Sequence, residues 1–138
     1  MNKTFIPTSK FTTKNWYIID CKEKKLGRIA SFIVSILSGK LKSYYYPSLD
    51  IGDYLILINV KFLLLDKSIQ KLHVFCPGRP GKSLKKVLNT FPQHMIQKCI
   101  TCMMPEGKAK KNLSTRLKIY QGSEHPHIAQ NPILLNNF

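Results

Sequence analysis

The chain has 138 residues, a length that fits one domain and leaves little room for two. Hydrophobic residues make up 43% of it, which excludes wholesale disorder, and no apolar run approaches the length that spans a membrane. Lys and Arg number 22 against 7 Asp and Glu, a formal net charge of +15, so a polyanionic partner is expected.

The types of cation indicate which polyanion is involved and how it is contacted. An anionic membrane surface competes with nucleic acid, but it is disfavoured because no long basic amphipathic helix stands out. Most basic residues are lysines, and the arginines are Arg28, Arg79 and Arg116. Lysine contacts phosphate as a point charge, whereas arginine can read a base with its planar fork. We therefore expect recognition of a nucleic-acid backbone and its shape rather than of its base sequence.

The first half of the chain predicts an arm followed by strand, helix and strand. Residues 1–15 are rich in Lys, Thr and Ser without periodicity, which indicates an extended basic arm. The β-prone run Trp16–Asp20 predicts a buried strand. Residues 26–37 place their apolar side chains on one stripe of a helix, and Gly39 follows where that helix would end. Residues 54–60 (YLILINV) are almost continuously apolar, which is typical of a strand covered on both faces.

The second half predicts a further strand and two helices. Residues 72–76 (LHVFC) predict a strand, residues 77–83 a basic Gly/Pro-rich loop, and residues 84–88 a short helix. Pro92 opens a longer helix with an apolar side, and Gly107 is expected to end it.

The end of the chain predicts one more strand and then little regular structure. Residues 117–120 read as a last short strand, and everything after Gly122 reads as an irregular C-terminal extension. Strands that alternate with helices predict a layered α/β domain. We expect a single domain over residues 16–138, preceded by the arm.

Residues 78–83 (GRPGKS) have part of the pattern of a phosphate-binding loop, since they lie between a predicted strand and a predicted helix. The glycine that the motif requires five residues before Gly81 is replaced by Cys76, and Pro80 removes a backbone donor. Nucleotide hydrolysis is therefore the weaker interpretation. The stronger one is a basic loop that contacts RNA phosphates through Arg79, Lys82, Lys85 and Lys86.

One cysteine pair and one histidine pair are candidates for a metal or redox site. Cys99 and Cys102 have the spacing of metal ligands, but one such pair is a weak signal and the same spacing fits packing along a helix. His125 and His127 are better explained as loop residues beside a basic segment. No Ser/His/Asp or Cys/His constellation is supported, so neither a catalytic residue nor a cofactor is assigned. Without a signal-peptide pattern, the cysteines are expected to be reduced in an intracellular protein.

Three consecutive tyrosines, residues 44–46, follow Lys40 and Lys42. Basic residues interleaved with aromatic ones are typical of nucleic-acid binding, because rings stack on unpaired bases. Tyr44 is the candidate for this role. Burial of at least one of the three against the sheet is an equally good interpretation.

Ten short stretches, taken in order, together resemble one protein family. They are residues 16–20 (WYIID), 26–30 (LGRIA), 37–40 (LSGK), 46–47 (YP), 50–54 (DIGDY), 77–81 (PGRPG), 104–107 (MPEG), 117–120 (LKIY), 124–127 (EHPH) and 129–132 (AQNP). Each is weakly specific, but the ordered set covers nearly the whole chain. It is similar to the universal large-subunit ribosomal protein thirteen in its bacterial and plastid form. The chain departs from the family pattern after Val60, at Cys102 and after Gly107, where residues other than the usual glycines stand.

The resemblance implies a three-layer α/β/α fold around a four-stranded, mainly parallel sheet. It implies binding to large-subunit ribosomal RNA early in assembly, with other large-subunit proteins as neighbours. It also implies no catalytic activity. No cofactor, membrane association or small-molecule substrate is expected. RNA contact is carried over to Arg28, Lys40, Arg79, Lys108, Arg116, His125 and His127.

Few arginines among many Lys, Ile and Asn residues are typical of an AT-rich genome, and the chain starts near the N-terminus usual in the family. Both features favour a plastid-encoded protein, with a bacterial or mitochondrial ribosome as the alternative. The complete predicted RNA-binding set is Lys25, Arg28, Lys40, Lys42, Tyr44, Arg79, Lys82, Lys85, Lys86, Lys108, Lys110, Lys111, Arg116, Lys118, His125 and His127.

Overall fold

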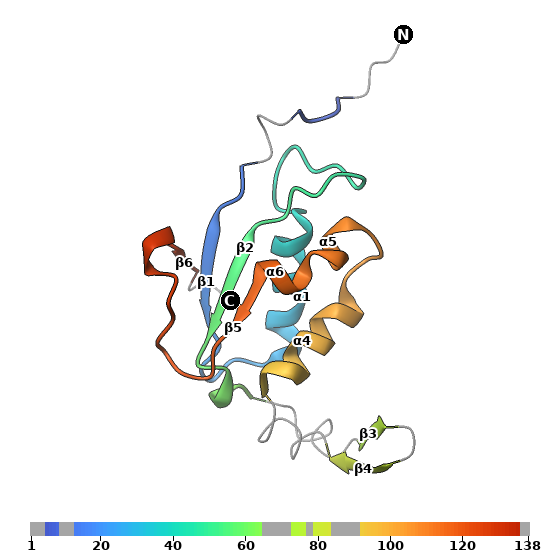
Figure 1. Ribbon diagram of the computed structural model, residues 1–138, viewed down its shortest axis with the longest axis vertical. Helices are drawn as coiled ribbons and strands as arrows, with labels where there is room; N and C mark the ends of the chain where they lie inside the picture. The colour runs from blue at the N-terminus through green and yellow to red at the C-terminus, as the bar shows by residue number, and fades with distance from the viewer. Residues whose placement is uncertain (1–4, 9–12, 65–72, 77–78, 84–91, 136–138) are drawn as a thin grey trace.

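A four-stranded sheet lies at the centre of the molecule (Figure 1). The structure is a computed structural model that describes residues 5–8, 13–64, 73–76, 79–83 and 92–135. Every neighbouring pair of strands in this sheet is parallel. The spatial order is β5-β2-β1-β6, with bounds Leu117–Ile119, Tyr54–Ile58, Trp16–Asp20 and Ile133–Leu135. The predicted α/β fold with a four-stranded parallel sheet is confirmed.

Side chains alternate along the strands and form a core on each face of the sheet. On one face, Ile19, Leu55 and Leu57 are fully buried and belong to the main hydrophobic core. On the other face, Ile18 and Ile56 are buried as well. Strand β2 is apolar on both faces because both are covered, which is the reason its sequence shows no alternation.

Helix α1 (Leu26–Ser38) connects β1 to β2 and packs its apolar stripe on the sheet. Ile29, Ile33 and Ile36 are each at most 2% exposed. The helix ends at Gly39, whose φ of +79° lies in the left-handed region that glycine adopts without a steric penalty. The Gly39 N–H donates to the Ile36 carbonyl at 3.0 Å, which satisfies an acceptor at the end of the helix.

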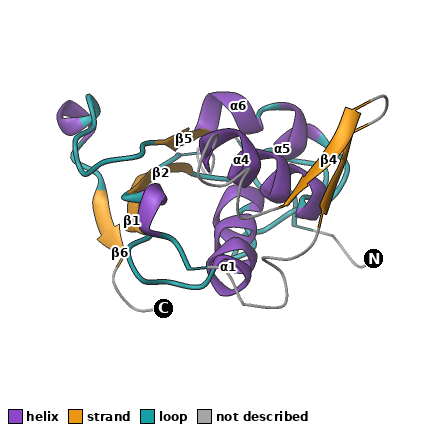
Figure 2. Cartoon of the chain, turned by 90° about the horizontal axis from the view of Figure 1, so that it is seen from below, coloured by secondary structure: helices purple, strands orange, loops and turns teal. Residues whose placement is uncertain are grey.

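The elements form three layers. Helices α4 (Pro92–Met103), α5 (Lys108–Lys111) and α6 (Leu113–Arg116) lie on the same side of the sheet as α1 (Figure 2). The chain after β5 passes over the opposite side, forms the short 3-10 helix η3 (Ile128–Gln130), and returns as β6. The third layer is therefore this C-terminal segment rather than a long helix. Among the described residues, no helix is long and apolar enough to cross a membrane.

Residues 72–83 differ from their prediction. Strand β3 (His73–Cys76) forms as expected, but it lies outside the central sheet and pairs antiparallel with β4 (Arg79–Ser83). The predicted Gly/Pro-rich loop is thus mostly the second strand of a hairpin. The register is irregular between Val74 and Cys76, and such a bulge tolerates a proline that cannot donate to the ladder. The short helix predicted at 84–88 falls outside the described residues.

Two further expectations were wrong in their details. Helix α4 ends at Met103 rather than at Gly107, and Gly107 instead precedes α5 with a φ of +153°. The segment after Gly122 is irregular only in part, because it supplies η3 and the edge strand β6. Strand β6 pairs with β1 through a parallel register that satisfies backbone groups on the open edge of β1. Three residues are too few to show a strand's periodicity in the sequence.

Candidate nucleic-acid interface

The predicted RNA-binding residues lie on several parts of the surface rather than in one site. Arg28 is exposed near the start of α1, and Lys40 is exposed just beyond its end. The lysines of α5 lie beside the loop that precedes β2 (Figure 1). Lys118 belongs to β5 and lies on the face of the sheet opposite α1. Arg79 and Lys82 belong to β4, whose side chains are not described, and Lys85 and Lys86 lie outside the described residues.

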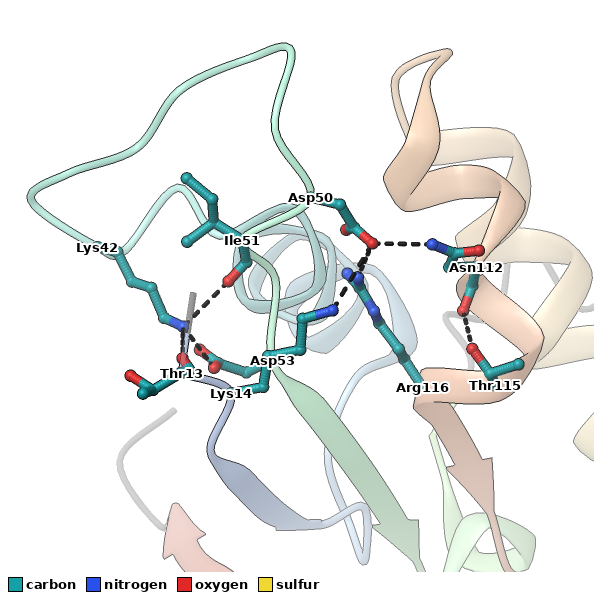
Figure 3. Close-up of polar contacts among 9 residues, drawn as sticks. All are labelled: Thr13, Lys14, Lys42, Asp50, Ile51, Asp53, Asn112, Thr115 and Arg116. Carbon is teal, nitrogen blue, oxygen red and sulfur yellow. Dashed lines mark hydrogen bonds and ion pairs between the residues drawn. The ribbon is translucent and has the colours of Figure 1, made fainter. Parts of the chain in front are cut away.

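One predicted contact, Lys42, is held inside the protein (Figure 3). Its ammonium group lies 2.6 Å from Asp53 Oδ1 and also donates to the carbonyls of Thr13 and Ile51, both at 3.0 Å. Asp53 Oδ1 accepts a further bond from the Asn15 N–H at 2.9 Å. The side chain of Lys42 is only 11% exposed. Its three donors are engaged, so Lys42 joins the end of the basic arm to the loop before β2 instead of facing a ligand.

Arg116 is also internal. Its guanidinium forms an ion pair with Asp50, and the Arg116 side chain is 2% exposed. Asp50 Oδ2 accepts a second bond from Asn112 Nδ2 at 2.8 Å and lies 3.7 Å from Lys14 Nζ. Asp50 Oδ1 and Arg116 Nη1 are the buried polar side-chain atoms without a partner in the described part of the chain. This cluster joins three segments that are distant in sequence: the arm, the loop before β2, and α6 (Figure 3).

The electrostatics of Asp50 reflect its partners. Burial by itself raises the pKa of the Asp50 carboxyl, but the hydrogen bonds from Arg116 and Asn112 and the charges of Arg116 and Lys14 outweigh it. The pKa therefore lies below its ordinary value of 3.8. The carboxyl is ionised at neutral pH and keeps the buried guanidinium paired.

Gly52 is required by this arrangement. A Cβ at Gly52 would lie 2.6 Å from the carbonyl carbon of Leu37, closer still to its oxygen, and 2.8 Å from Arg116 Nη1. The loop before β2 therefore packs directly on the last turn of α1, with the Arg116 side chain alongside. Asp50, Gly52 and Asp53 lie in one of the stretches that carry the family resemblance, but the role of the two acids as ion-pair acceptors around a glycine was not predicted. The sequence signal for this role was the proximity of Asp50 and Asp53, because the chain has only seven acidic residues.

Helix α5 carries three lysines in four residues. Lys108 and Lys111 are exposed and pair with no acid in the described part of the chain. Lys110 instead lies 2.5 Å from the Glu106 carboxylate, four residues earlier. The helix contains no acidic residue, so Lys108 and Lys111 are free to contact an anion.

The predicted histidines take part in an aromatic cluster on the face of the sheet opposite α1. His127 Nε2 and the Tyr120 hydroxyl are 2.8 Å apart, and His125 Nδ1 accepts a bond from the His127 N–H at 3.3 Å. The His127 ring also lies 5.3 Å from that of Trp16, which stacks on Tyr54 at 4.5 Å. Both histidines are half-buried, so their first role is to hold the C-terminal segment on the sheet.

The alternatives to nucleic-acid binding find little support in the geometry. No group of three or more His, Cys, Asp or Glu side chains gathers among the described residues in a way that could hold a metal. Burial raises the pKa of the Cys21 thiol to about 12, and burial followed by the charge of Cys102 raises that of Cys99. Residues 79–83, the centre of the suspected phosphate-binding loop, form a strand of a hairpin.

Comparison with known proteins shows that a chain with this fold and this basic surface is a ribosomal protein. A family model described as Ribosomal protein L13 matches residues 14–126. The chain belongs to the Ribosomal protein L13 family. It is a structural component of the large ribosomal subunit and not an enzyme, and the resemblance found in the sequence is confirmed.

The similar proteins match over nearly their full length. The large ribosomal subunit protein uL13c of Trieres chinensis is 51% identical over 138 residues, which cover 100% of this chain and 99% of that protein. The large ribosomal subunit protein uL13 of Nostoc sp. is 39% identical, covering 99% of this chain and 94% of its own. That of Prochlorococcus marinus is 36% identical, covering 99% and 100%.

Proposed function

We propose that the protein binds and stabilises large-subunit ribosomal RNA by neutralising its phosphates, and that it does so early in assembly. The observation that carries this proposal is the surplus of free positive charge. The formal net charge is +15. Four cations are exposed and pair with no acid in the described part of the chain: Arg28, Lys40, Lys108 and Lys111. Cations without acidic partners repel one another, and a polyanion removes that repulsion.

The internal ion pairs support the proposal that some cations stabilise the fold while others contact RNA. Lys42 and Arg116 act as positioning residues, because their charged groups are engaged by Asp53 and Asp50. They hold the arm, the loop before β2 and α6 in one arrangement, from which α5 projects. The predicted contacts that remain in the proposal are Lys25, Arg28, Lys40, Tyr44, Arg79, Lys82, Lys85, Lys86, Lys108, Lys110, Lys111, Lys118, His125 and His127.

The proposed partners are ribosomal RNA and neighbouring large-subunit proteins, and the proposed location is the plastid ribosome. The higher identity to the protein called uL13c than to the cyanobacterial relatives supports this location. Co-sedimentation with plastid large ribosomal subunits tests it. Recovery of the native protein only with bacterial-type or mitochondrial particles would contradict it.

The RNA-binding proposal is tested by the dependence of affinity on salt. Each phosphate contact contributes about 0.9 to the slope of log affinity against log salt on a duplex. The double variant Lys108→Ala, Lys111→Ala is expected to lower that slope by about 1.8 with large-subunit ribosomal RNA. Lys110→Ala is the matched variant in the same helix, and its pairing with Glu106 predicts a smaller change. An affinity that is independent of salt would contradict the proposal.

Two further measurements address the kind of readout and the stage of assembly. Arg79→Ala is expected to weaken binding to different RNA sequences by a similar factor, because phosphate contacts carry no base information. A change of base preference would show that Arg79 reads a base. Early action predicts binding to protein-free ribosomal RNA, and binding only to particles that already contain other proteins would contradict it.

A further inference from the structure

Three rings stand in a row on the face of the sheet opposite α1. Trp16 on β1 and Tyr54 on β2 are cross-strand partners, and their rings are parallel to within 9° with centroids 4.5 Å apart. The His127 ring lies 5.3 Å from Trp16, tilted by 31°. The order is therefore His127, Trp16, Tyr54. The alternation along β1 and β2 puts these rings on the side away from Ile19 and Leu55, which face the helices.

The row is open at one end. Trp16 contacts two rings, those of Tyr54 and His127, but Tyr54 has one ring partner among the described residues, which is Trp16. Strand β5 begins at Leu117, opposite Leu55, so no residue of β5 lies directly beside Tyr54. The preceding residue, Arg116, turns its side chain to Asp50 (Figure 3). The second face of the Tyr54 ring thus borders a place that β5 does not cover.

The polar edges of the two rings reach solvent. Neither the Trp16 indole N–H nor the Tyr54 hydroxyl has a hydrogen-bond partner within the described structure. The fully buried side-chain atoms without a partner, over the same residues, are Asp50 Oδ1 and Arg116 Nη1. The indole and hydroxyl groups are therefore not sealed off, and each can donate to a ligand.

A cation lies on the same face. Lys118 on β5 is the register partner of Ile56, two residues after Tyr54, so its side chain is a diagonal neighbour of the open ring. Lys118 is half-buried and pairs with no acid among the residues described. An aromatic surface with a lysine beside it is suited to one nucleotide, whose base stacks on the ring while its phosphate meets the ammonium group.

We propose that Tyr54, at the open end of this row, binds one unpaired base of large-subunit ribosomal RNA, with Lys118 at the adjoining phosphate. The inference rests on the proposed RNA-binding function and names a site for it on the sheet rather than on α5. Protein is the less suitable occupant here, because the exposed apolar residues on this side, Ile128 and Leu134, lie at the other edge of the sheet, over β6. Near Tyr54 the structure places the half-buried Trp16 ring and the half-buried Lys118 side chain.

The chain offers a direct optical test, because Trp16 is its one tryptophan. In the variant Trp16→Phe, Tyr54→Trp the indole moves to the base-facing position. Unpaired oligoadenylate is expected to quench this variant's fluorescence more strongly than that of the wild type, in which Tyr54 separates the indole from the base. A duplex of oligoadenylate with oligouridylate presents phosphates but no free base, and it is expected to quench neither protein. Equal responses to single strand and duplex would overturn the inference.

A second pair of variants does not depend on the exchange. Tyr54→Leu removes the ring and is expected to weaken binding of unpaired RNA about tenfold with little change in the salt slope, whereas Tyr54→Phe keeps the ring and most of the affinity. On large-subunit ribosomal RNA, one base protected from chemical modification by the wild type should become reactive with Tyr54→Leu. An unchanged pattern of protection would overturn the inference.

The outcomes separate this site from the general function. If RNA still binds with a steep salt dependence while the Tyr54 variants change nothing, the base site is refuted and the RNA-binding proposal stands. If no RNA binds at all, the proposed function fails as well. Quenching of the relocated tryptophan by large-subunit proteins without RNA would show that this surface contacts protein, which also overturns the inference.

Discussion

Replacement of Gly52 by alanine tests the packing of the loop before β2 against α1. The new Cβ would lie 2.6 Å from the Leu37 carbonyl carbon and closer still to the carbonyl oxygen, whereas ordinary contact begins at 3.4 Å. The two segments must therefore separate by more than about 0.8 Å. The atoms in the way are backbone at the end of a helix and the buried Arg116 guanidinium, which cannot rotate aside as a flexible surface side chain would. We therefore expect a loss at the upper end for overpacking, about 3 kcal/mol of the free energy of unfolding.

Thermal unfolding followed by circular dichroism measures this loss. For a chain of 138 residues, 3 kcal/mol corresponds to a fall in Tm of about 10 °C. Gly27→Ala is the matched control, since no atom lies within 4 Å of a Cβ at Gly27 and its position in α1 favours alanine. That control should raise stability by up to about 1 kcal/mol. A Gly52→Ala protein that melts with the wild type would refute the close approach of the loop to the helix.

Three other predictions concern the buried polar groups and the thiols. Asp50→Ala is expected to lower the free energy of unfolding by about 3–5 kcal/mol, because it leaves the Arg116 charge buried without a partner. Adding Arg116→Met should recover part of that loss in urea unfolding, and strictly additive losses would contradict the ion pair. The folded-state pKa of Asp50 lies below 3.8, so the stability that its ionised form contributes is complete above that pH and is lost as the pH falls through the folded pKa. Melting curves of the wild type and Asp50→Asn should therefore differ at neutral pH and converge in acid, and a constant gap would contradict the assignment. Among the three cysteines whose burial is described, iodoacetamide at about pH 8 should modify Cys102 first, Cys99 more slowly and Cys21 only on unfolding, because only thiolates react. Peptide masses measure this order, and early modification of Cys21 would refute its burial.

Periodicity in the sequence was enough to predict β1, α1 and β2, because each carries a run of apolar residues whose spacing matches its structure. The sequence could not assign strands to sheets. Strand β3 has a typical strand composition, but its partner is β4 rather than a strand of the central sheet, and local composition does not reveal pairing. Strand β6 has three residues, two of them exposed, so it lacked the pattern that marks a buried strand.

The basic surface was predictable as a total charge, but the role of each cation was not. Lys42 and Arg116 are chemically like the lysines of α5, and only the tertiary structure brings acids to them across 11 and 66 residues of sequence. The stack of Trp16 on Tyr54 was hidden for the same reason. The two residues were assigned to separate strands, and their contact depends on a strand register that the sequence does not encode locally.

The strand order constrains how the chain reaches its native state. Strand β1, near the beginning of the sequence, is flanked by β2 and by β6, and the β1 partner of Ile133 is Tyr17, 116 positions earlier (133 minus 17). Pairing over that separation carries a large loop-closure entropy and slows folding. A half-formed intermediate with β1 and β2 already joined would expose a bare ladder edge along β1, a template for unwanted association between nascent chains. Docking of the last strand therefore completes the sheet and also covers the edge of β1.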